Sequence, residues 1–131
     1  MALLNLKKEL TLDEIATCLF LLPNKVQFCH HSTTSYSAHK SLDELYEATS
    51  SLKDEIIEKI MGYCGMRYKT LALTPITSFK EAMINEVLNE GLVFAKKLQE
   101  WAVREQYPDI ENLAQSYSGA FAQAKYLSTL K

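Results

Sequence analysis

The sequence has few of the residues that form tight turns: of 131 residues, only 4 are Gly and 3 are Pro. A sandwich or barrel of many short strands needs more turn residues than this, so we exclude those folds. Basic side chains are not in excess either, because 14 Lys and Arg stand against 16 Asp and Glu, giving a net charge of −2. This balance argues against a basic nucleic-acid-binding module.

Long apolar runs are also missing. The longest, residues 18–23, is far too short to span a bilayer, so we expect no membrane segment. The start of the chain, MALLNLKKEL, has no apolar stretch before a small-residue cleavage site, and we expect no signal peptide. Three cysteines, Cys18, Cys29 and Cys64, cannot all pair within one chain and form no C-x-x-C motif. Buried thiols in a reducing compartment are the interpretation that this favours.

The composition is typical of a globular protein, since 47% of the residues are hydrophobic and 23% are charged. The length predicts one domain over residues 1–131. A chain of this size can bury enough surface to fold without disulfides or a structural metal.

Apolar residues at helical spacing predict a first long helix. A capping box at Thr11-Leu12-Asp13-Glu14 marks its start, and the polar cluster of residues 31–35 marks its end. Pro23 falls inside this helix. Because proline removes a backbone hydrogen bond and clashes with the preceding turn, we expect the helix to be kinked or broken at Pro23.

A second helix is predicted from about Ser37, with the glycine pair Gly62 and Gly65 as its stop. Residues 66–77 then form the one long connection. Their apolar and β-branched content indicates that this connection packs across the helices.

The third helix is predicted to open with another capping box, residues 78–81, and to end near Gln106. The fourth follows the turn at residues 107–109 and continues to the end of the chain. Gly91 and Gly119 lie inside these helical patterns, where each costs about 1 kcal/mol relative to Ala. Glycine is worth that cost if two helices approach closely there.

Four long helices with two short connections and one long connection predict an all-α fold, a four-helix bundle in the ferritin-like style. No phosphate-binding glycine loop, nucleophile elbow or zinc-finger spacing interrupts it.

A line of polar side chains follows one face of the predicted second helix, at steps of three or four residues. A solvated surface stripe is one interpretation of it. The other is a metal site, because histidine with paired carboxylates on bundle helices is the ligand set of non-haem iron centres. The members of the line are His39, Asp43, Tyr46 or Glu47, Ser50, Asp54 and Glu58.

Distance restricts how such a site could form. His39 and Asp54 are 15 residues apart, which is about 22 Å along one helix, so one ion with bonds of about 2 Å cannot touch both. Two antiparallel copies of the helix, related by a two-fold axis, could bring His39 of one copy to Asp54 and Glu58 of the other and create two equal sites. His30 could add a second nitrogen, or it could be an ordinary core histidine.

These residues resemble a known family. His39-Lys40-Ser41-Leu42-Asp43-Glu44-Leu45-Tyr46, followed by Asp54-Glu55-Ile56-Ile57-Glu58, is similar to the second helix of the miniferritins, the DNA-binding proteins from starved cells. Residues 30–42, HHSTTSYSAHKSL, are closer still to small ferritin-like proteins of tailed phages, which typically read H-W-x-T-x-S-Y-A-x-H-K-A-L. The ending at residues 124–130 resembles the last helix of those phage proteins.

The resemblance implies iron ligands at His30, His39, Asp54 and Glu58, with Asp43 as a nearby or bridging carboxylate. It also implies a homo-oligomer through the first two helices, binding of Fe²⁺ at the dimer seam, its oxidation by peroxide or dioxygen, and storage in a hollow shell. The segment between His30 and His39 is shorter than in miniferritins, which leaves open whether the two histidines converge. The Lys-rich tail used for DNA binding is missing, so we expect no nucleic-acid partner.

Three functions follow as hypotheses. The first is a phage-type, iron-binding ferritin-like bundle, a possible ferroxidase, in the host-cell cytoplasm or the virion. The second is a metal-free structural protein of the virion built on the same bundle, with other virion components as partners. The third is a binding module without chemistry, such as a small antirepressor or a host-factor binder.

Overall fold

Four α-helices account for the regular structure of residues 9–130, which are the residues that the computed structural model describes. Their bounds are α1 Leu12–Ser32, α2 Tyr36–Cys64, α3 Ala82–Glu105 and α4 Pro108–Leu127. No strand occurs among these residues. The expected all-α four-helix bundle is therefore confirmed.

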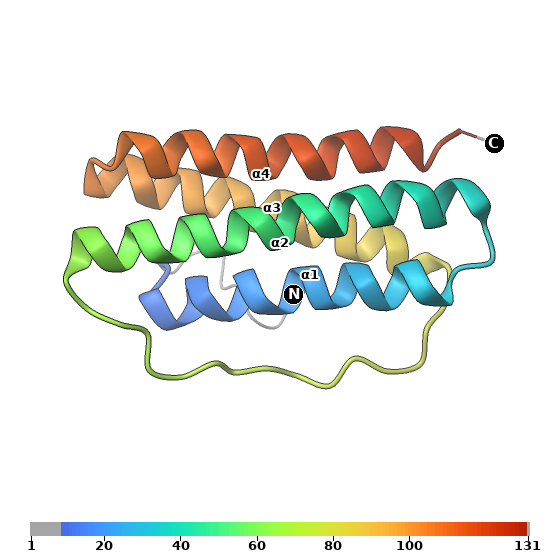
Figure 1. Cartoon of the computed structure of the whole chain (residues 1–131), viewed down its shortest axis with the longest axis horizontal. Helices are drawn as coiled ribbons and strands as arrows, with labels where there is room; N and C mark the ends of the chain where they lie inside the picture. The colour runs from blue at the N-terminus through green and yellow to red at the C-terminus, as the bar shows by residue number, and fades with distance from the viewer. Residues whose placement is uncertain (1–8, 131) are drawn as a thin grey trace.

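The helices form two antiparallel hairpins, α1 with α2 and α3 with α4, joined by a connection that crosses the length of the bundle (Figure 1). Because of this crossover, α2 and α3 run in the same direction. Helix α1 packs against α2 and α3, and α4 packs against α3 and α2. Every packed pair is consequently antiparallel, and the two parallel pairs, α2 with α3 and α1 with α4, lie diagonally across the core.

Helix α1 begins at the expected capping box. The Thr11 hydroxyl accepts from the Glu14 backbone N–H, and the Glu14 carboxylate accepts from the Thr11 N–H in return. The helix then continues through Pro23 as one element, so a break there does not occur. Pro23 is buried among apolar neighbours such as Leu22 and Val26, and this packing offsets the hydrogen bond that proline removes.

Helix α2 stops at the second glycine of the expected pair. Gly65 has φ of 67°, in the left-handed region, and its N–H donates to the Met61 carbonyl. A left-handed residue at this position is a common helix end and favours glycine. Gly62 lies inside the helix and does not terminate it.

The start of α3 differs from the prediction, and the capping box at residues 78–81 is wrong. Ser78 has φ of 58°, whereas a capping serine needs extended backbone. Glu81 is the residue before the helix, and no side chain caps it. Its carboxylate instead accepts from the Thr33 hydroxyl and the Thr34 N–H, in the turn between α1 and α2. The Glu81 side chain, which the local sequence pattern assigned to a helix cap, therefore binds residues that are distant in the sequence.

The long connection packs along α1, as its composition predicted (Figure 1). The Lys69 N–H donates to the Asp13 carboxylate at 2.8 Å, and the Ala72 N–H donates to the Thr17 hydroxyl at 3.1 Å. The ring of Tyr68 packs edge-on against the ring of Phe20 in α1, with the two ring centroids 6.1 Å apart. These contacts supply partners for a backbone that has no helix or sheet of its own.

The two helical glycines have different surroundings. A Cβ at Gly91 would lie 2.3 Å from the ring of Phe121, so α3 and α4 do approach closely there. A Cβ at Gly119 would meet nothing within 4 Å, and Gly119 is exposed, so no close approach of helices accounts for this glycine.

The three cysteines are free thiols, and two of them, Cys18 and Cys29, are buried. Burial raises the pKa of the Cys18 thiol to about 12 and that of Cys29 to about 11. Both side chains therefore stay protonated and act as small apolar groups in the core.

The centre of the bundle contains one unpaired polar atom among the described residues, the hydroxyl of Tyr117. Tyr117 is fully buried, and its ring packs against Phe94 and Phe121. Burial raises the pKa of the phenol, and the Cys18 thiol adds to the effect. The phenol is neutral at every ordinary pH, yet it still lacks a hydrogen-bond partner.

Tyr117→Phe is expected to increase the free energy of unfolding by about 1 kcal/mol, because it removes a desolvated hydroxyl and keeps the ring. Urea denaturation followed by circular dichroism measures the effect. A loss of stability would mean that the hydroxyl has a bonding partner in solution, such as a buried water molecule.

Candidate metal centre

The two histidines of the sequence prediction converge at one end of the bundle. His30 lies in the last turn of α1 and His39 in the first turns of α2, and only residues 33–35 separate the two helices. This short reversal lays the end of one helix against the start of the next. The two imidazole rings stack with their centroids 4.1 Å apart and their planes 21° apart.

Reciprocal hydrogen bonds fix the orientation of both rings. Nδ1 of His30 lies 2.8 Å from the His39 carbonyl oxygen, and Nδ1 of His39 lies 3.1 Å from the His30 carbonyl oxygen. A carbonyl can only accept, so each Nδ1 carries the hydrogen and donates it. In the neutral rings, each Nε2 then keeps a free lone pair, which is the arrangement found for metal-binding histidines held by a backbone carbonyl.

Asp43 brings a carboxylate to the same end of the bundle. It lies one turn after His39 on α2, and its Oδ1 is 3.8 Å from Nε2 of His30. The His30 side chain is only 13% exposed, whereas that of Asp43 is 48% exposed. Asp43 and the two histidines therefore lie at the same solvent-exposed end of the bundle, although within one chain they do not form a three-ligand group that could hold a metal ion.

Asp54 and Glu58 do not join this cluster. Both are exposed on α2, which is continuous from Tyr36 to Cys64, so about 22 Å of helix separates His39 from Asp54. Within residues 9–130, no group of three or more His, Cys, Asp or Glu side chains could hold a metal ion. Completing the predicted ligand set needs a second chain.

One residue that supports the histidine pair, Glu81, is not among the predicted site residues. Glu81 binds Thr33 and Thr34, in the turn that carries the chain from His30 to His39. It thereby ties this turn to the start of α3. No sequence signal marks this contact, because residues 78–81 fit a capping box and the partners are 47 and 48 residues apart.

The polar line on the exposed face of α2 lies within an acidic stretch of the helix. Between His39 and Lys59 the sequence has six carboxylates and three lysines. One lysine, Lys53, lies over the Phe20 ring at 4.6 Å, and another, Lys59, pairs with Glu55. The uncompensated negative charge favours the approach of a cation to this face.

The fold and the site geometry thus define an all-α bundle that has one long crossover and a pair of histidines at one end. Residues 30–127 match the model of a family described as a family of unknown function, DUF5856, and the chain belongs to that family. The match begins at His30 and includes all five predicted ligands.

The chain is also similar to a protein of Enterobacteria phage T4, described as an uncharacterized 14.6 kDa protein in the mobD-ri intergenic region. The two are 27% identical over 123 residues, which cover 91% of this chain and 88% of the phage protein. No solved structure matches the chain. The matches indicate a small protein of phage type, and neither description names an activity.

None of the helices formed by residues 9–130 has the length and apolar character needed to cross a bilayer.

Proposed function

We propose that this chain is a phage-type, ferritin-like protein that binds Fe²⁺ at a two-fold seam between two copies and oxidises it. The observation that carries the proposal is the histidine pair, in which both Nδ1 atoms are held by backbone carbonyls, so that each Nε2 can offer its lone pair to a metal. The single long crossover supports it as well, because ferritin-like bundles have one such connection.

The proposed site takes ligands from both copies. His30, His39 and Asp43 of one chain would bind together with Asp54 and Glu58 of the partner subunit, whose α2 lies antiparallel. Histidine nitrogens with carboxylate oxygens suit Fe²⁺. The same two-fold axis generates a second, equal site.

The residues of this chain would hold and orient Fe²⁺ as the substrate. Each Fe²⁺ loses one electron, and one hydrogen peroxide takes up two electrons and two protons from solvent while its O–O bond breaks to give two waters, so two Fe²⁺ are consumed for each peroxide. The acidic face of α2 raises the local concentration of cations, and it also makes two metal-free copies repel each other. Iron binding is expected to strengthen the dimer for this reason. The host-cell cytoplasm or the virion is the proposed location.

Anaerobic titration with Fe²⁺, followed by one peroxide for every two iron ions, tests the proposal. The expected result is a ferric absorbance band that saturates at a fixed ratio of iron to chain. The His39→Ala, Asp54→Ala double variant should show no band above that of the buffer, while circular dichroism confirms that it is folded. A wild-type protein whose spectrum stays unchanged would reject the iron proposal.

The second candidate is a metal-free structural protein of the virion built on the same bundle. The same titration distinguishes the two candidates, because a structural protein leaves the iron spectrum at its buffer value and tolerates the double substitution.

A further inference from the structure

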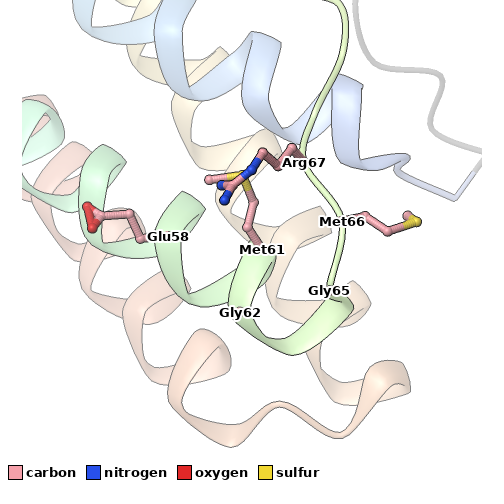
Figure 2. Close-up of a pocket in the computed structure, with 6 residues that line it drawn as sticks. All are labelled: Glu58, Met61, Gly62, Gly65, Met66 and Arg67. Carbon is pink, nitrogen blue, oxygen red and sulfur yellow. The ribbon is translucent and has the colours of Figure 1, made fainter.

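A surface pocket of about 410 Å³ opens where α2 ends and the long connection begins (Figure 2). Its lining residues are Glu58, Met61, Gly62, Gly65, Met66 and Arg67. In Figure 2, Arg67 comes from the connection on the same side as Met61, while Met66 points away from both. The pocket therefore combines a thioether and a guanidinium beside Glu58, one of the proposed iron ligands.

Gly62 keeps this pocket open. It lies inside α2, where glycine costs about 1 kcal/mol relative to alanine. At Gly91 the missing side chain makes room for Phe121, but a Cβ at Gly62 would meet nothing within 4 Å. Inside the described chain, the small size of Gly62 therefore relieves no clash, and the free space faces outward.

Tyr36 is the side chain that could fill such a space in another copy. It is the first residue of α2 and is 77% exposed, more than any other large hydrophobic residue of the described chain. It precedes Asp54 by 18 residues, which is five full helical turns, so the two residues lie on the same face of α2.

The register of the proposed seam brings the two features together, and this step rests on the proposed function. If His39 lies midway between Asp54 and Glu58 of the partner subunit, it faces about residue 56 there. Tyr36 comes three residues earlier in an antiparallel pair, so it faces about residue 59. Helical side chains lean toward the helix N-terminus, which here carries the ring further along the partner, toward Gly62 of the partner subunit.

We propose that Tyr36 of each chain inserts into this pocket of a second copy and fixes the register of the two-fold seam. The ring packs over Gly62 of the partner subunit and against the thioether of the partner subunit's Met61, a favourable sulfur–aromatic contact. The guanidinium of the partner subunit's Arg67 lies over the ring face as a cation–π partner. The two-fold axis makes this contact twice.

Photo-crosslinking tests the proposal directly. The full-length chain with benzoylphenylalanine in place of Tyr36 is irradiated with EDTA and, separately, with Co²⁺, a redox-stable substitute for Fe²⁺. The expected product in at least one condition is a covalent dimer whose attachment maps to residues 61–67. A monomer in both conditions, or attachment elsewhere, would overturn the proposal. The same label at Tyr126, which is 60% exposed on α4, should not reach residues 61–67.

A pair of glycine variants provides an independent measurement. Gly62→Leu fills the pocket, whereas Gly119→Leu adds the same side chain on α4, where a Cβ also meets nothing within 4 Å. Both variants should fold. Gly62→Leu is expected to weaken the dimer at least tenfold by sedimentation, and Gly119→Leu to leave it within twofold of wild type. Equal dimer affinity in the two variants would contradict the proposal.

These outcomes separate the seam from the iron chemistry. Crosslinking to residues 61–67 without ferric absorbance would keep the Tyr36 contact and reject the iron proposal. Ferric absorbance without that crosslink would keep the iron proposal and reject the Tyr36 contact.

Discussion

Mixing two inactive variants, His39→Ala and Asp54→Ala, is expected to restore about one quarter of the wild-type iron sites. Each proposed site takes His39 from one chain and Asp54 from the other. A dimer with one chain of each kind therefore has one intact site and one site that lacks both residues. Random pairing makes half of the dimers mixed, which leaves about a quarter of all sites intact. Iron oxidation after joint refolding measures the recovery.

The matched control is a mixture of His30→Ala with His39→Ala. The same chain supplies both histidines to each proposed site, so every site in a mixed dimer lacks one of them. No recovery is expected from this mixture. If His39→Ala and Asp54→Ala also fail to restore each other, although both variants fold and form dimers, the site is not shared across a seam.

Gly91→Ala is expected to lower the free energy of unfolding by about 2 kcal/mol, although alanine is the better helix former. The added methyl would lie 2.3 Å from Phe121, whose ring is fully buried between α3 and α4 and cannot turn aside into solvent. Overfilling a packed core costs about 1–3 kcal/mol and exceeds the gain in helix propensity. Urea denaturation midpoints measure the change.

Gly119→Ala is the control for this prediction, because its methyl meets nothing within 4 Å. It should raise the free energy of unfolding by about 1 kcal/mol through helix propensity alone. Phe121→Leu should remove most of the cost of Gly91→Ala when the two changes are combined. Equal stabilisation by Gly91→Ala and Gly119→Ala would show that α3 and α4 are not in close contact at this point.

Sequence motifs that involve only a few neighbouring residues predicted the helices well. The capping box at Thr11 and the left-handed stop at Gly65 lie where the sequence indicated, because both motifs satisfy backbone groups within one helical turn. The same kind of pattern failed at residues 78–81, since Glu81 binds the turn between α1 and α2. A local motif does not reveal that a residue distant in the chain competes for the same side chain.

The glycines show the same limit. Gly91 and Gly119 have the same setting in the sequence, a helical pattern interrupted by one small residue. Only the packing of α4 against α3 decides that the first meets Phe121 and the second meets open space. Of the two glycines predicted to mark the end of the second helix, Gly65 caps α2 and Gly62 lies inside it.

The sequence by itself determined the four helices and the polar line on the second. It also determined that His39 and Asp54 are too far apart to bind one ion in a single chain, because the rise of a helix fixes that distance. The tertiary structure decided that His30 and His39 stack, that each Nδ1 meets the other's carbonyl, and that a pocket opens beside Gly62. Helical periodicity assigns a residue to a face, whereas which faces meet depends on how the connections bring the helices together.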